Sequence, residues 1–141
     1  MGSTGNDMTF DNLVNIMYSW GHALKPYHYF GFRSYFNQML DSKQVAFIQG
    51  ESGPICILFF SIVDDCTDIH KKAEWDLPRN NILGNKIYVD KMICQSWTPS
   101  LRRTVQDWIE ETFPQVDEGY YHKAPRDKCV KIYRRRRLCT V

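Results

Sequence analysis

The sequence predicts one domain of the α+β class, in which helices pack on a mostly antiparallel sheet. Two amphipathic helical patterns come first, strand-like runs then follow one another directly, and one further helical pattern separates the last strand runs. Strands that are neighbours in sequence favour antiparallel pairing, which excludes a doubly wound parallel sheet. With 141 residues, 43% of them hydrophobic, the chain can form one core, and it has no apolar run long enough for a membrane helix.

Two helices are predicted near the N-terminus. Apolar residues recur at helical spacing from Phe10 to Tyr18, and Thr9 is a suitable N-cap for that helix. A second stripe, at positions i, i+3, i+4, i+7 and i+8, runs from Phe32 to Leu40. We interpret both stripes as faces that form a core.

The next two runs predict a β-hairpin. Residues 44–49 and 54–63 flank Gly50-Glu51-Ser52-Gly53, a strong turn signal. The run 54–63 is almost entirely apolar, so we expect a strand that is covered on both faces. Residues 64–83 are polar and predict a long connection between paired strands, of a length that is uncommon without a function.

A strand, a helix and two shorter strands complete the predicted order. Residues 86–94 are strand-like, and residues 99–112 form a helical pattern that begins with proline. Residues 120–123 and 129–135 predict the last two strand segments. The single helix between these groups permits one parallel βαβ crossover, which we expect to be right-handed.

The sequence predicts the limits of the domain and contains a run of arginines near its C-terminus. We expect residues 1–8 to be disordered, residues 9–135 to form the domain, and residues 136–141 to be a basic tail. The run from Arg134 through Arg135 and Arg136 to Arg137 can bind phosphate, acidic protein or RNA, or it can be a solvated terminus. The net charge of +2 does not favour a broad nucleic-acid surface.

The five cysteines lack CxxC spacing, which predicts reduced thiols that mostly fill the core of an intracellular protein. No zinc site is predicted, because close paired spacing of four ligands is missing from the sequence. We therefore expect a cytoplasmic location, with association with a virion as the alternative.

Several short segments form an ordered series: Ser19-Trp20, Pro26-Tyr27-His28, QVAFIQGESGPICILFFS, GNKIYVDKMIC and Phe113-Pro114. Over about residues 10 to 135 this series resembles the toxin-activating lysine acyltransferases, the hemolysin-activating family related to GNAT acyltransferases. The resemblance implies a GNAT-like fold, with two N-terminal helices, a mostly antiparallel central sheet and one βαβ crossover helix. It implies transfer of an acyl group from acyl carrier protein or acyl-coenzyme A to a protein amine, with no resident cofactor or metal.

The resemblance assigns the catalytic positions to His28 and Asp90. Acyl transfer to an amine needs a base, and an aspartate can orient a histidine that acts as one. The junction between strand 86–94 and the next helix offers backbone N–H groups to an anionic donor. Arg102 and Arg103 oppose the helix dipole there, which indicates an anionic ligand. The predicted donor-binding residues are Gln95, Ser96, Trp97, Ser100, Arg102 and Arg103.

The roles of His28 and Asp90 and the function of the whole chain each have an alternative interpretation. His28 lies in the tyrosine-rich segment PYHYFGF and can be a packed core histidine, and Asp90 can be the alternating polar residue of a half-buried strand. The whole chain can be a catalytically silent GNAT-like structural or interaction protein, by analogy with small phage virion or accessory proteins. A third hypothesis is a nucleic-acid-associated module that uses Arg134 to Arg137.

Overall fold

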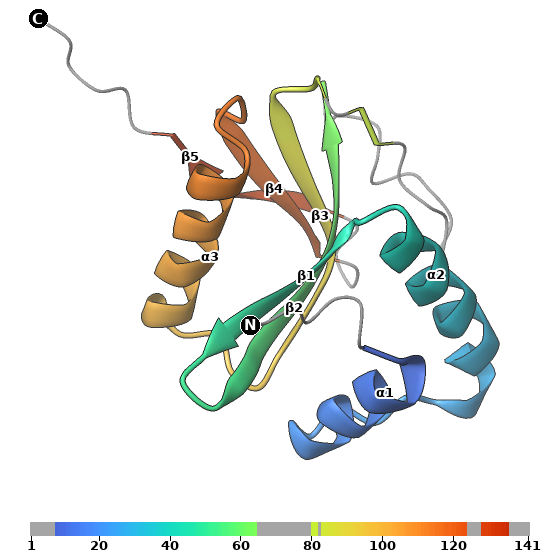
Figure 1. Ribbon diagram of the computed structural model, residues 1–141. Coiled ribbons are helices and arrows are strands. Elements are labelled where there is room, and N and C mark those ends of the chain that lie inside the picture. Colours follow the sequence, from blue (N-terminus) through green and yellow to red (C-terminus); the bar gives the residue numbers. More distant parts are fainter. Residues whose placement is uncertain (1–7, 65–79, 82, 124–127, 136–141) are drawn as a thin grey trace, which may run out of the picture.

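The computed structural model describes residues 8–64, 80–81, 83–123 and 128–135. It is of the α+β class, as predicted, with three α-helices and one five-stranded sheet (Figure 1). The elements are α1 (Phe10–Ser19), the short 3₁₀ helix η1 (Pro26–His28), α2 (Tyr29–Asp41), β1 (Val45–Gly50), β2 (Gly53–Val63), β3 (Lys86–Cys94), α3 (Pro99–Thr112), β4 (Glu118–Lys123) and β5 (Lys128–Arg134).

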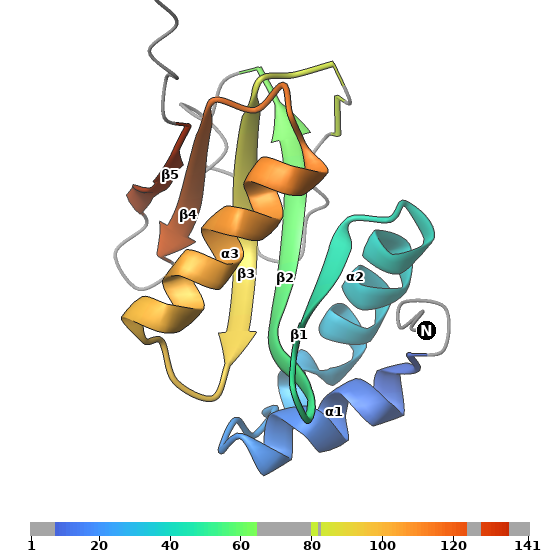
Figure 2. The ribbon, with the colours of Figure 1, turned by 60° about the vertical axis from the view of Figure 1, so that its left-hand side comes forward.

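The sheet has the strand order β1-β2-β3-β4-β5. All neighbours pair antiparallel except β3 and β4, which are parallel and joined through α3. Helices α1 and α2 cover one face of the sheet and α3 covers the other (Figures 1 and 2). The predicted order of elements and the single βαβ crossover are therefore confirmed.

Each face of the sheet has its own apolar core. Under α1 and α2, side chains of both helices pack on Ile57 and Phe59 of β2. Under α3, its Leu101, Val105 and Ile109 pack on apolar residues of all five strands. Both faces of β2 are thus covered, as its unbroken apolar run predicted.

Local signals set the ends of the helices. The Thr9 hydroxyl accepts a hydrogen bond from the backbone N–H of Asn12 at 3.1 Å, which caps α1. Gly21 follows α1 with φ of +85°, a conformation that a residue without a Cβ adopts easily. Thr98 caps α3 through the N–H of Leu101 at 3.1 Å, and Pro99 occupies the first turn.

The C-terminal arginines do not behave as one solvated tail. Arg134 is exposed, but the guanidinium of Arg135 donates hydrogen bonds to the carbonyl oxygens of Glu110 at 3.3 Å, Phe113 at 3.1 Å and Val116 at 3.0 Å. Arg135 therefore closes the C-terminal end of α3, where carbonyl groups lack intrahelical partners.

Three predictions lie wholly or mostly outside the described residues: residues 1–7 of the segment 1–8, most of the long connection 64–83 and the tail 136–141. Met8, the one described residue of the segment 1–8, is partly buried against the α1–α2 core and is not a disordered residue. Where the connection is described, the side chain of Asn80 accepts from the N–H of Ile62 at 2.9 Å. The N–H of Asn81 donates to the Ile62 carbonyl at 2.7 Å, so the connection returns along the end of β2. No helix in the described ranges is both long and apolar enough to cross a membrane.

Candidate functional site

Asp90 occupies a β-bulge in β3. In the pairing of β2 with β3, Phe60 is opposite Val89 and Phe59 is opposite Lys91, so Asp90 is the additional residue between them. A bulge bends its strand and redirects a side chain. Asp90 is thus not the alternating polar residue of a regular strand, which was the structural alternative from the sequence.

The Asp90 carboxylate is buried against α2. Only 4% of the residue is exposed, and the Tyr35 hydroxyl of α2 donates a hydrogen bond to Oδ2. The Tyr88 hydroxyl lies 3.5 Å from Oδ1. Burial, followed by the negative charge of Asp90, raises the pKa of Tyr35, so this phenol stays protonated and donates to the carboxylate. Two tyrosine hydroxyls therefore face the predicted catalytic acid.

His28 lies at the end of η1, directly before α2. The residue is half-buried, and the centroid of its ring lies 4.2 Å from that of the Tyr27 ring. The backbone N–H of His28 donates to the Lys25 carbonyl at 2.9 Å. Seven residues, about two helical turns, separate His28 from Tyr35. The predicted catalytic residues thus belong to the same side of the sheet, and their direct pairing stays a prediction.

Strands β3 and β4 part at the level of Asp90. Their parallel pairing joins Lys86–Val89 to Glu118–Tyr121, and the described pairing stops there although β3 continues to Cys94. A cavity of about 380 Å³ lies beside this parting. Its wall is formed by Met92, Cys94, Trp97, Arg102, Tyr121, Val130, Lys131 and Ile132. Met92, Cys94, Tyr121 and Ile132 belong to the α3-side core, so the cavity opens on that face of the sheet.

The six predicted donor-binding residues are divided among three hollows. Trp97 and Arg102 line the cavity at the parting. Gln95, Ser96 and Ser100 line a second cavity of about 250 Å³, together with Trp20 and residues of the β1–β2 hairpin. Arg103 lines a groove between α3 and β5, which Arg102 also borders. The described surface therefore does not bring the six residues together in one cavity, and their role in donor binding stays a prediction.

Tyr121 is the residue of this site that sequence reasoning missed. It lines the cavity and is half-buried, and its pKa is raised by burial first, with electrostatic interactions with Cys94 and Asp90 next. Its phenol is thus electrostatically coupled to both the cavity wall and the predicted catalytic acid. The only sequence signal was the pair Tyr120-Tyr121, of which a strand turns one member to each face.

The thiol of Cys94, which lines the cavity, and that of its neighbour Cys56 are not activated nucleophiles. Cys56 of β2 stands opposite Cys94 of β3, and both are free. Burial raises the pKa of Cys56 to about 12 and also raises the pKa of Cys94. Both thiols therefore remain protonated at neutral pH, in agreement with their predicted role as filler.

The cavity combines an apolar wall with a cation. Met92, Val130 and Ile132 supply apolar surface, and Arg102 has no ion-pair partner within the part of the chain that the structure describes. This arrangement suits a ligand with an apolar stem and an anionic group. Comparisons of the chain with protein-family models, with curated proteins and with solved structures found no match.

Proposed function

We propose that this protein is an acyltransferase of GNAT-like architecture that moves an acyl group from a carrier thioester to a protein amine. The observation that carries the proposal is the parting of the parallel strands β3 and β4 beside a cavity of about 380 Å³. Strands that separate in this way open the sheet to a ligand at the point where a buried acid, Asp90, interrupts β3. The resemblance in sequence adds His28 and Asp90 as the implied catalytic positions.

The acyl donor occupies the cavity in this proposal. Its apolar stem lies on Met92, Val130 and Ile132, and an anionic group of acyl carrier protein or coenzyme A pairs with the Arg102 guanidinium. Backbone N–H groups of the first turn of α3 add little to this site, because Pro99 has none, Leu101 donates to the Thr98 hydroxyl and Arg102 donates to the Thr98 carbonyl. Acyl carrier protein and acyl-coenzyme A both carry the thioester on a phosphate-bearing arm, so the proposal includes either of them as the donor.

The proposed chemistry assigns one proton transfer to each of two side chains. The amine nitrogen attacks the thioester carbonyl, the C–N bond forms and the C–S bond breaks. In this proposal the donor lies on the α3 face, and the amine reaches its thioester through the parting from the α1–α2 side, where His28 takes the amine proton and Asp90 stabilises the resulting imidazolium. Tyr121, whose pKa is raised, gives its proton to the departing thiolate. Each proton that leaves the amine or reaches the thiolate is thus accounted for.

The test is acyl transfer measured by mass spectrometry. The chain is incubated with acyl carrier protein thioester or acyl-coenzyme A and with lysine-containing acceptor proteins. His28→Gln and Tyr121→Phe should each lower the rate by about 100-fold or more. Tyr120→Phe is the matched control, because Tyr120 bonds Glu118 at 3.1 Å and does not line the cavity. If wild-type protein transfers no acyl group from either donor, the proposal is wrong.

One observation favours a second candidate, a silent GNAT-like structural or interaction module. The Asp90 carboxylate is buried and accepts a hydrogen bond from Tyr35, so its role can be to stabilise the packing of α2 on the sheet and not to take part in catalysis. In that case wild-type protein transfers no acyl group, while Asp90→Asn lowers the melting temperature. A nucleic-acid module has less support, because Arg135 binds carbonyl groups of α3.

A further inference from the structure

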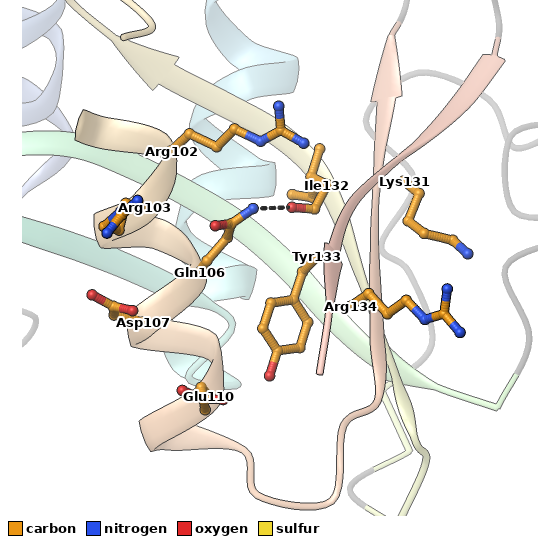
Figure 3. Close-up of a pocket in the computed structure, with 9 residues that line it drawn as sticks. All are labelled: Arg102, Arg103, Gln106, Asp107, Glu110, Lys131, Ile132, Tyr133 and Arg134. Atoms are coloured by element: carbon orange, nitrogen blue, oxygen red, sulfur yellow. Dashed lines mark hydrogen bonds between the residues drawn. The ribbon is translucent and has the colours of Figure 1, made fainter. Parts of the chain in front are cut away.

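The groove between α3 and β5, which Arg102 and Arg103 border, is separate from the two cavities described above. This groove has a volume of about 500 Å³ and is bordered by Arg102, Arg103, Gln106, Asp107, Glu110, Lys131, Ile132, Tyr133 and Arg134 (Figure 3). Strand β5 pairs with β4 on one side and is the end of the described sheet on the other. An edge strand presents backbone donors and acceptors to any chain that lies beside it.

The groove contains a buried polar atom that needs a partner. Tyr133 is only 5% exposed, and its hydroxyl has no hydrogen-bond partner in the described residues. Figure 3 shows its ring between α3 and β5, with the hydroxyl directed toward the Glu110 end of the groove. Most buried hydroxyls in folded proteins are hydrogen-bonded, so an unsatisfied one inside a hollow indicates a missing acceptor or donor.

The charges around the groove are mostly positive. Four of the lining residues are cationic and two are acidic. Arg102 reaches from α3 toward β5, whereas Lys131 and Arg134 extend from the opposite side of β5 (Figure 3). Arg102, Arg103 and Arg134 have no ion-pair partner within the described ranges, while Lys131 pairs with Glu118 at 2.7 Å. Guanidinium groups therefore stand on both sides of the same strand edge.

We propose that this groove binds an extended acidic peptide segment of a partner protein, which adds a strand to β5. Backbone hydrogen bonds to β5 give affinity, a peptide oxygen accepts from the Tyr133 hydroxyl, and acidic side chains pair with Arg102 and Arg134. Successive side chains of a strand point to opposite faces, which matches guanidinium groups on both sides of β5. The inference does not require acyl transfer, but the groove shares Arg102 with the cavity at the parting, so the test uses Tyr133 and Arg134, which do not line that cavity.

The dimensions of the groove fit a short segment. From Arg102 to Glu110 the helix advances about 12 Å, the length of about four residues of extended chain. One hydrogen bond now crosses the groove, from Gln106 to the Ile132 carbonyl at 3.0 Å, and the proposed segment displaces Gln106 and takes over this acceptor. The segment therefore lies between a helix and an edge strand, as in β-augmentation.

A peptide fits these residues better than a nucleic acid. Single-stranded nucleic acids bind by stacking bases on accessible rings, and the only aromatic ring of the groove, Tyr133, is buried. The edge of β5, by contrast, offers the backbone pairing that only another polypeptide can complete.

Fluorescence anisotropy with labelled peptides tests the proposal. The probe is a heptapeptide of alternating glutamate and valine, and a lysine–valine heptapeptide is its charge control. The glutamate peptide should bind and the lysine peptide should not. Tyr133→Phe and Arg134→Glu should each weaken binding by about tenfold. Arg33→Glu, the same charge change at an exposed position of α2 on the other face of the sheet, should leave binding unchanged.

Circular dichroism melting separates binding from folding. Tyr133→Phe removes a hydroxyl that has no described partner, so the melting temperature should not fall. Absence of glutamate-peptide binding overturns the proposal, as does equal weakening by Arg33→Glu and Arg134→Glu. A labelled single-stranded RNA that binds more tightly than the peptide, and loses binding in Arg134→Glu, also overturns it.

Discussion

The guanidinium of Arg135 allows a sharp test of how α3 is held. It donates three hydrogen bonds, at 3.0, 3.1 and 3.3 Å, to carbonyl oxygens within the last turn of α3 and just after it, and it lies 3.7 Å from the Glu110 carboxylate. A hydrogen bond from a charged donor contributes about 1.5–3 kcal/mol when it is buried. The Arg135 side chain is 28% exposed, and water can replace part of its contacts, so the sum must be reduced.

We expect Arg135→Ala to lower the free energy of unfolding by about 2 kcal/mol, which corresponds to a melting temperature lower by about 4–8 °C. Compared with Arg135→Ala, Arg135→Lys should recover only the stabilisation that a positive charge gives at the helix C-terminus, about 0.3–1 kcal/mol. The assay is urea unfolding followed by circular dichroism. Arg134→Ala is the control, because Arg134 is exposed, and it should change the free energy by less than about 0.5 kcal/mol. Equal losses at the two positions would refute the reasoning.

Two further predictions concern Tyr35 of α2 and Glu118 of β4. Tyr35→Phe removes a donor from the buried Asp90 carboxylate and should lower the free energy of unfolding by about 2–4 kcal/mol. In a double-mutant cycle with Asp90→Asn the two losses should be less than additive, and additive losses would contradict a direct contact. Hydrogen bonds from Lys131 and then Lys86 lower the pKa of Glu118 from 4.5 to about 2. Because the folded-state pKa is the lower one, this stabilisation is present above about pH 4.5 and is lost as the pH falls toward 2. Urea unfolding at several pH values should show that the free energy of unfolding falls less over this pH window in Glu118→Gln than in the wild type. An equal fall in the two proteins would count against the prediction.

Hydrophobic spacing was sufficient to predict most of the fold. The strand 86–94 and the helix 99–112 coincide with β3 and α3, because an apolar run bounded by glycine and a capped amphipathic run are local signals. The last two strands differ from the predicted segments by one or two residues at their ends. Local signals also identified Thr9 as the cap of α1.

The site was less predictable because its contacts are distant in sequence. The Tyr35 hydroxyl bonds a carboxylate 55 positions away, and a helical apolar stripe gives no sign of such a bond. Tyr121 reaches the cavity only because β3 and β4 part beside it. The residues from Gln95 to Ser100 are contiguous in sequence, but the turn into α3 directs them toward two different cavities.

The bulge in β3 has a consequence for how this strand is built. Val89 and Met92 share the α3 face with their partners Phe60 and Leu58, and Lys91 lies opposite Phe59 on the other face. If Asp90 were deleted, every remaining residue of β3 would keep its face, and the strand would become regular. Asp90 is therefore an insertion that the sheet does not need for its alternation. What Asp90 adds to the strand is its carboxylate and the bend of the bulge.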